Sequence, residues 1–195
     1  APAPEGSAPE RESFSDVVLV GRLREAIDKL NPDLSKDAKE DALKRVLRHE
    51  SPKLIVDNDK FHSLLVNGVD VEYRRKDGKI VGGKIALFDF ERPENNDFVA
   101  VNQFTIIEDR HNRRPDIILF INGLPLVVIE LKNPADENAT VDTARAQFET
   151  YKIEIPSLFR YNEILIASDG NEAVAGTITS DKERFTAWKT VDGKK

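Results

Sequence analysis

The chain has 195 residues, 39% of them hydrophobic, so it is long enough to bury the core of one domain. It contains no cysteine, which excludes disulfides and thiolate metal sites, and no apolar run of the roughly 18–20 residues that a membrane-spanning helix needs. The formal net charge is −6, whereas a protein that binds DNA by itself usually carries a basic excess.

The N-terminal end differs in composition from the rest. Residues 1–13 (APAPEGSAPERES) are rich in Pro, Ala, Glu and Ser, so we expect a disordered tail or linker there and one folded domain over residues 14–195. The first ten residues lack the basic and apolar regions of a secretory signal. The chain contains no methionine, even at position 1, so we expect it to be a segment of a longer protein. With the lack of cysteine, these features predict a cytoplasmic protein without membrane association.

Two helices are predicted first. Apolar residues on one face predict a helix over residues 14–30, which Asn31-Pro32 ends. Ser35 is placed to cap a second helix, because a serine oxygen accepts a hydrogen bond from a free N–H at a helix N-terminus. The apolar stripe of this second helix comprises Ala38, Ala42, Leu43, Val46 and Leu47.

The pattern then changes to that of β-strands. Alternating apolar residues and turn signals predict three strands, over residues 69–75, 84–90 and 96–107. Asp77-Gly78 marks the turn after the first of them.

A β-hairpin is predicted next. Residues 117–121 and 126–129 are apolar runs, and Asn122-Gly123 between them is a strong signal for a tight turn. The second run is apolar on both faces, which is typical of a central strand covered on both sides.

The last part of the chain mixes helix and strand. We expect a helix over residues 140–151 and a strand over 163–167. Ser180 and Glu183 form a capping-box pattern that predicts a short final helix toward Trp188. Helices, a run of strands, then helix and strand predict an α/β fold with a mixed central β-sheet flanked by helices.

Three charged residues interrupt the apolar hairpin. Glu130 and Lys132 end its second strand and project to the same side, because they are two residues apart. Asp116 lies six residues before the first turn residue, and Glu130 lies seven residues after the second. The two carboxylates should therefore lie close together, given a β-bulge near Pro125.

This arrangement is typical of a metal site. Two close carboxylates repel each other unless a proton or a cation lies between them, and Mg²⁺ prefers oxygen ligands. Asp116 and Glu130 would hold the metal while Lys132 orients a water, as metal-assisted phosphodiester hydrolysis requires. The alternative is that these charges are the solvated ends of a hairpin, with Asp116 capping a turn after Pro115.

The surrounding sequence resembles a known family. RRPDIILFINGLPLVVIELKNP, residues 113–134, is similar to the nuclease motif in the N-terminal region of the restriction (R) subunit of type I restriction–modification enzymes. The resemblance extends over roughly residues 14–190. It includes LLVNGVDVEYRR, NDFVAVNQFTI, AQFETYKIEIPSLFRYNEILIASDGNEAVAGT and ERFTAWK.

The resemblance implies a restriction-endonuclease-like PD-(D/E)xK fold, with Asp116 and Glu130 as metal ligands and Lys132 as the catalytic lysine. Gln147 and Tyr151 match the family's Q-x-x-x-Y motif, and residues four apart lie on one face of a helix. The alternative for this pair is structural, with Tyr151 in the core and Gln147 in solvent. Family members usually carry a further acidic residue on an N-terminal helix, which this sequence does not show.

Basic residues lie just ahead of Asp116. Arg110, Arg113 and Arg114 are predicted to contact DNA phosphates, although charge runs in turns are often only solvated. The three histidines share no ligand spacing, so we predict no role for them.

The function that the resemblance implies is endonucleolytic cleavage of double-stranded DNA in defence against foreign DNA. Mg²⁺ would be the cofactor, with Mn²⁺ able to substitute, and the methyltransferase (M) and specificity (S) subunits would be partners. No G-x-x-x-x-G-K-[ST] motif occurs, so we expect ATP to be bound only by the full-length subunit. The alternatives are another PD-(D/E)xK nuclease, or a docking module between motor and methyltransferase core with no activity in isolation.

Overall fold

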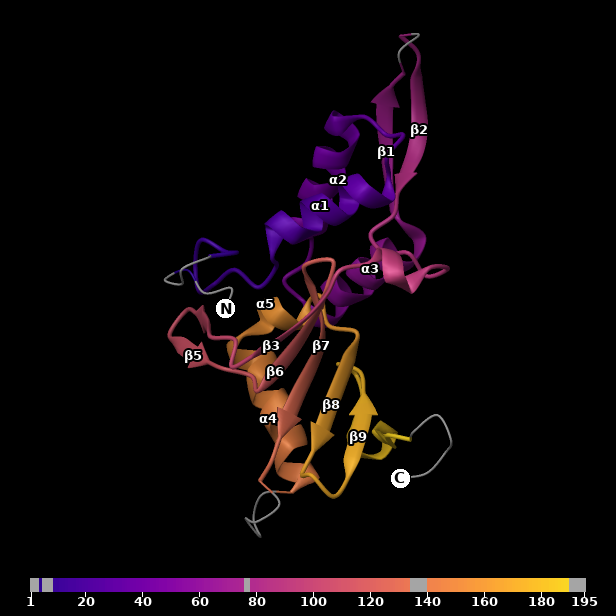
Figure 1. The fold of residues 1–195 in the computed structure, drawn as a ribbon. Helices are drawn as coiled ribbons and strands as arrows, with labels where there is room; N and C mark the ends of the chain where they lie inside the picture. Colours follow the sequence, from indigo (N-terminus) through magenta and orange to yellow (C-terminus); the bar gives the residue numbers. More distant parts are fainter. Residues whose placement is uncertain (1–3, 5–8, 76–77, 134–139, 190–195) are drawn as a thin grey trace.

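The computed structural model describes residues 4, 9–75, 78–133 and 140–189 (Figure 1). The helical elements are α1 (Val20–Leu30), α2 (Lys36–Leu47), α3 (Leu54–Asn67), η1 (Pro93–Asn95), α4 (Val141–Glu154), α5 (Pro156–Phe159) and η2 (Lys182–Arg184). The strands are β1 (Val69–Arg74), β2 (Ile80–Ile85), β3 (Phe98–Asn102), β4 (Ile106–Glu108), β5 (His111–Arg113), β6 (Ile117–Ile121), β7 (Leu124–Leu131), β8 (Ile164–Ser168), β9 (Ala173–Gly176) and β10 (Thr186–Ala187).

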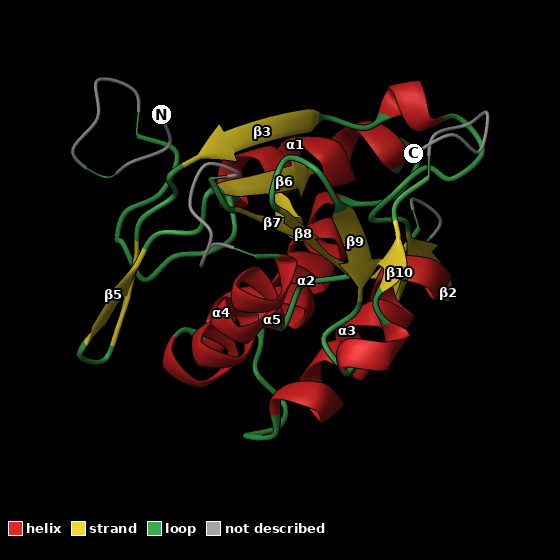
Figure 2. Cartoon of the chain, turned by 90° about the horizontal axis from the view of Figure 1, so that it is seen from below, coloured by secondary structure: helices red, strands yellow, loops and turns green. Residues whose placement is uncertain are grey.

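Six strands form the central sheet, in the order β10–β9–β8–β7–β6–β3. β7 and β8 run parallel, whereas the other neighbouring strands are antiparallel. A parallel pair needs a long crossover, and the chain between β7 and β8 contains α4 and α5. Figure 2 shows these two helices together on one side of the strands. The predicted α/β fold, a mixed sheet flanked by helices with a restriction-endonuclease-like core, is confirmed.

The β6–β7 hairpin forms as predicted. Its two turn residues have φ values of 53° and 78°, as a tight hairpin turn requires. The pairing register shifts between Leu119 and Phe120, and Phe120 pairs with Pro125, which places the bulge where it was expected. A Cβ on Gly123, the second turn residue, would lie 2.4 Å from the carbonyl oxygen of Leu19. Glycine thus allows the turn to contact the N-terminal segment closely.

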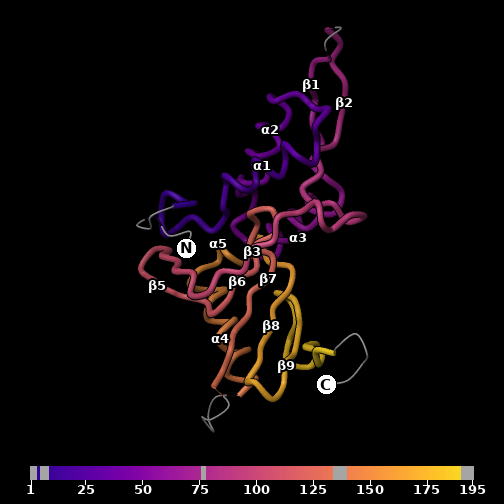
Figure 3. Tube along the Cα trace, viewed as in Figure 1, coloured from indigo at the N-terminus to yellow at the C-terminus, as the bar shows by residue number. Residues whose placement is uncertain are grey.

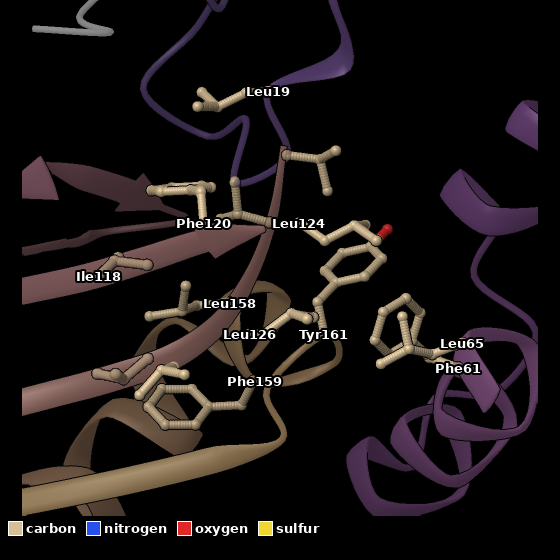
Figure 4. Close-up of a cluster of buried hydrophobic side chains, with 14 of the residues drawn as sticks. Leu19, Phe61, Leu65, Ile118, Phe120, Leu124, Leu126, Leu158, Phe159 and Tyr161 are labelled. Carbon is tan, nitrogen blue, oxygen red and sulfur yellow. The ribbon is translucent and has the colours of Figure 1, made fainter. Parts of the chain in front are cut away.

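The N-terminal helices and the β1–β2 pair form a lobe beyond one end of the central sheet. In Figures 1 and 3 the β1–β2 pair projects away from that sheet. Helix α3 connects the lobe to the sheet, because its Phe61 and Leu65 lie beside Tyr161 (Figure 4). The rings of Phe61 and Tyr161 meet edge to face, with centroids 4.9 Å apart.

Several predicted elements have the expected ends. Strand β1 and strand β8 lie within one residue of their predicted bounds. The Ser35 side chain caps α2 by accepting a hydrogen bond from the N–H of Ala38 at 3.3 Å. Helix α4 follows the cap residue Thr140, and extends three residues further than predicted.

The first helix is shorter than predicted. It begins at Val20 instead of residue 14, and Val17, Val18 and Leu19 are all buried without helical structure. The N–H of Leu19 donates to the carbonyl of Gly123 at 2.9 Å. This long-range bond fixes the start of the helix, which local periodicity does not reveal.

Two predicted strands have wrong bounds. The strand expected over 84–90 is β2, which begins four residues earlier, at Ile80, and ends five residues earlier, at Ile85. Strand β2 ends at Ile85 because the Asn31 side chain accepts from the N–H of Ala86 at 2.8 Å and donates to its carbonyl at 2.9 Å. The strand expected over 96–107 divides into β3 and β4, because Gln103 turns the chain with a φ of 53°. The turn expected at Asp77 lies outside the described residues.

The predicted final helix is wrong. Residues 182–184 form one 3-10 turn, whose N-cap is Asp181, and β10 follows it at the sheet edge. Ser180 instead accepts a hydrogen bond from the N–H of Thr177 at 3.0 Å. Tertiary pairing of β10 with β9 therefore replaces the local helical preference.

One face of the central sheet is only partly covered. Figure 1 views this face, and no described helix crosses β7 or β8 there. Phe98, Leu131 and Ile164 are 57%, 46% and 40% exposed on it. β7 is the central strand that was predicted. The prediction that both of its faces are covered is wrong at the end of the strand, where Leu131 is exposed.

Residues just ahead of residue 14, the predicted start of the domain, also pack against the core. Arg11 is buried, and its Nη2 donates to the carbonyl of Thr105 at 2.7 Å. Its guanidinium lies 3.8 Å from the centroid of the Phe104 ring. Most of the expected tail, residues 1–3 and 5–8, lies outside the described residues.

No helix in the described part of the chain has both the length and the apolar character to cross a membrane.

Candidate active site

Asp116 and Glu130 meet at one end of the central sheet. Ile117 pairs with Ile129 in the β6–β7 ladder, so Asp116, just before β6, and Glu130, near the end of β7, are neighbours. The backbone N–H of Asp116 donates to Oε1 of Glu130 at 3.4 Å. In return, the N–H of Leu131 donates to Oδ2 of Asp116 at 2.8 Å. The hairpin register therefore brings the two carboxylates together.

Asp116 is also bound from the neighbouring strand. Nε2 of Gln103 donates to Oδ1 of Asp116 at 3.1 Å. The backbone N–H of Gln103 donates to the Asp116 carbonyl at 2.9 Å, which extends the pairing of β3 with β6 by one residue. Each oxygen of this half-buried carboxylate thus accepts a hydrogen bond from a different neighbouring strand segment.

Glu130 is almost completely buried. Its exposed fraction is 1%, and it lies on the face of β7 that the helices cover. The pKa of Glu130 is raised to about 7, mainly by burial and to a smaller extent by the negative charge of Asp116. With this pKa, Glu130 is only partly ionised at neutral pH, and a nearby cation would favour its ionised form.

Lys132, Gln147 and Tyr151 form a hydrogen-bonded chain beside the carboxylates. Nζ of Lys132 donates to Oε1 of Gln147, and Nε2 of Gln147 donates to the Tyr151 hydroxyl at 2.5 Å. Both partners lie four residues apart on α4, on the side that faces β7. Burial, followed by the charge of Glu130, raises the pKa of Tyr151 to about 12, so its hydroxyl keeps its proton.

The two alternatives for the Gln147–Tyr151 pair therefore do not exclude each other. The Tyr151 ring belongs to the buried core, as the structural alternative holds, but its hydroxyl reaches the charged residues. Gln147 is half-buried and bonds both Lys132 and Tyr151, so it is not simply solvated.

The carboxylates suit a hard divalent cation. Asp116 and Glu130 offer oxygen atoms only, and a cation would offset both their mutual repulsion and the burial of Glu130. No group of three or more acidic, histidine or cysteine side chains with metal-binding geometry occurs among the described residues. The protein ligands of a cation here would therefore be these two carboxylates, completed by backbone or solvent oxygens.

The basic residues ahead of Asp116 have different environments. Arg110 and Arg114 are exposed and extend into solvent from the β4–β5 region. Arg113 instead forms a bidentate ion pair with Glu154 at the end of α4, with Nη2 and Oε1 2.8 Å apart. His111 lies 3.3 Å from the same carboxylate. The guanidinium of Arg113 therefore joins β5 to α4.

Two of the contacts around the site have no signal in the local sequence. Gln103 lies 13 residues from Asp116, and Glu154 lies 41 residues from Arg113. No local pattern marks either residue, because each contact depends on the packing of separate elements. The turn at Gln103 likewise has no local sequence signal, and the positive φ of this residue reveals it.

Known proteins resemble this chain along most of its length. The chain matches the family described as type I restriction enzyme R protein N terminus over residues 2–184. It is 49% identical over 185 residues to the type I restriction enzyme HindI endonuclease subunit of Haemophilus influenzae, covering 94% of this chain and 17% of that protein. It is 36% identical over 186 residues to the putative type I restriction enzyme MjaIXP endonuclease subunit of Methanocaldococcus jannaschii, covering 94% of this chain and 18% of that protein.

The chain thus spans less than a fifth of the length of these two relatives. The family match covers nearly all of it and includes every candidate site residue. The chain belongs to the family of type I restriction enzyme R protein N termini.

Proposed function

We propose that this chain is the nuclease part of a type I restriction enzyme R subunit, and that it hydrolyses phosphodiester bonds of double-stranded DNA. The observation that supports this most directly is the convergence of Asp116, Glu130 and Lys132 at one end of the sheet. Two relatives that match 94% of this chain are named as endonuclease subunits of type I restriction enzymes, one of them as a putative one. Such a function would defend the cell against foreign DNA.

Each residue has a role that its environment supports. Asp116 and Glu130 would hold Mg²⁺, for which Mn²⁺ can substitute. The cation would stabilise negative charge on the phosphoryl oxygens and lower the pKa of water. Lys132 would place its ammonium Nζ beside the attacking water, with Gln147 fixing that nitrogen. Tyr151, which stays protonated, would hold Gln147 in place.

DNA contact and partners extend the same proposal. Arg110 and Arg114 are exposed, ahead of Asp116 in the chain, and would bind phosphates, whereas Arg113 would have to leave Glu154 to do so. Because the net charge is −6, tight binding to DNA would depend on the rest of the R subunit and on the M and S subunits. ATP would act in the remainder of the subunit. The reaction would take place in the cytoplasm, in keeping with a chain that has no cysteine.

The proposal is tested by calorimetric titration of Mn²⁺ into this chain at pH 8. We expect binding to the parent chain, and its loss in Glu130→Gln, which keeps the size of the side chain but removes the charge. Glu163→Gln is the matched control, because Glu163, the residue before β8, is also a largely buried acid with a raised pKa, yet it bonds His62. Equal binding by all three proteins would contradict the proposed metal site.

The chemistry is tested in the complete enzyme. Alanine at Asp116, Glu130 or Lys132 should leave assembly with the M and S subunits intact and abolish DNA cleavage. Cleavage that survives any of the three substitutions would overturn the nuclease assignment for that residue.

The partly covered face of the sheet favours a second function beside the first. Phe98, Leu131 and Ile164 expose apolar surface that a larger protein would cover. This supports the docking alternative, in which the chain joins the motor to the methyltransferase core. A docking surface has no need of converging carboxylates, so the alanine variants above separate the two functions.

A further inference from the structure

Gln103 adopts a backbone conformation that its side chain does not favour. Its φ is 53°, in the left-handed region that mainly glycine, asparagine and aspartate occupy. Among the described residues other than glycine, only Asp109 and Asn122 share this feature, and both lie in hairpin turns. A strained backbone of this kind is maintained only where surrounding contacts determine it.

The contacts of Gln103 converge on one residue. Its main-chain N–H and its side-chain amide both bind Asp116, at the carbonyl oxygen and at Oδ1. The other carboxylate oxygen, Oδ2, accepts from the N–H of Leu131. Two donors on opposite sides therefore fix the plane of the carboxylate. Residues that hydrogen-bond a metal-ligating carboxylate in this way typically tune metal affinity.

A competing explanation is purely structural. The turn at Gln103 also directs Phe104 into the core, where its ring lies 5.1 Å from that of Phe120. If the turn served only this purpose, glycine would make it equally well or better. The side-chain amide of Gln103 would then have no consequence for Asp116.

We propose that Gln103 is a positioning residue, which holds the Asp116 carboxylate in the orientation that a divalent cation requires. This inference rests on the proposed metal site and adds a residue to it that does not itself touch the cation. It predicts that a substitution which relaxes the backbone at this position will still weaken the site.

The test compares Gln103→Gly with Asp109→Gly in the whole chain. Both substitutions remove a left-handed non-glycine residue, and Asp109 lies in the β4–β5 turn, so both should raise the melting temperature. Only Gln103→Gly should weaken Mn²⁺ binding, by about tenfold in Kd. Unchanged Mn²⁺ affinity in Gln103→Gly would overturn the proposal and leave Gln103 as a turn residue.

A second readout needs no metal. Hydrogen exchange of the Leu131 amide reports how firmly Asp116 is held, because that amide donates to Oδ2. We expect exchange to be about tenfold faster in Gln103→Gly and unchanged or slower in Asp109→Gly. If the parent chain binds no Mn²⁺, the proposed function fails, and equal exchange in parent and Gln103→Gly overturns the role of Gln103 separately.

Discussion

Two buried acidic residues in this protein have opposite surroundings. Asp57, on α3, is 4% exposed and forms an ion pair with Arg160, whose Nε lies 2.5 Å from its Oδ2. Glu130, on β7, is 1% exposed and lies beside a second acid, Asp116. The first cluster supplies its own positive charge, and the second has an excess of negative charge at its centre.

This difference separates a structural ion pair from the proposed cation site. Arg160 also donates from Nη2 to the carbonyl of Arg48 at 3.1 Å, so the pair joins the N-terminal lobe to the segment after α5. In the Glu130 cluster, burial and the neighbouring charge of Asp116 instead make the ionised form of Glu130 unfavourable. Such a pair of acids is the arrangement that the proposed cation site requires, because a cation would offset both their repulsion and the burial of Glu130.

Removing the positive partner of Asp57 should have the largest effect on stability. Arg160→Leu leaves a carboxylate buried without its counter-charge, which typically costs about 3–5 kcal/mol. Chemical denaturation should show this decrease in the free energy of unfolding, and Arg24→Leu, at an exposed ion pair with Glu40, should cost less than about 1 kcal/mol. Equally small effects of the two substitutions would mean that the buried Asp57–Arg160 pair contributes no more to stability than an exposed ion pair.

Removing the charge of Glu130 should instead increase the stability of the metal-free protein. The raised pKa favours the protonated form in the folded state, so the stability that it contributes is complete below pH 4.5 and is lost as the pH rises through about 7. Without metal, Glu130→Gln should therefore be more stable than the parent at pH 8, by at most about 3.4 kcal/mol. The two proteins should be equally stable near pH 4, and a parent that stays the more stable at pH 8 would contradict this account.

A smaller effect is expected at the edge of the same cluster. Tyr151→Phe removes the hydroxyl that accepts from Gln147, which should lower the free energy of unfolding by about 1 kcal/mol. Because Gln147 then holds Lys132 less firmly, cleavage by the complete enzyme should also fall. Tyr161→Phe is a suitable control, since its hydroxyl contacts only the carbonyl of Val46, at 3.4 Å, and it should leave cleavage unchanged. Equal cleavage by both variants would remove Tyr151 from the site.

The smallest change in stability is expected on the partly covered sheet face. Ile164→Lys places a charge on exposed surface, so the free energy of unfolding should change by less than about 0.5 kcal/mol and Mn²⁺ affinity should stay the same. Assembly of the complete enzyme should weaken if a partner covers this face. Normal assembly, measured by size-exclusion chromatography, would show that this part of the face is not a docking surface.

The sequence predicted the hairpin and its charges well because their signals are local. The turn at Asn122-Gly123 and the alternation of side chains determine where Asp116 and Glu130 meet, including the bulge near Pro125. The Q-x-x-x-Y spacing likewise placed Gln147 and Tyr151 on one helical face.

Other features escaped prediction because they depend on contacts between distant segments. Helix α3 has few buried residues and no side-chain cap, so its sequence carries a weak helical pattern. The break at Gln103 and the end of β2 at Ile85 are set by bonds to residues far along the chain. The prediction of a final helix failed because β10 pairs with β9 instead.

The most direct test of the central claim is the pH dependence of Mn²⁺ binding to the parent chain. With a pKa of about 7, the ionised fraction of Glu130 falls about tenfold between pH 8 and pH 6. If Glu130 holds the cation, calorimetry should show Mn²⁺ affinity falling by about the same factor over this range. Binding that is equally tight at both pH values would contradict the account, because the cation would then lie away from the buried acid.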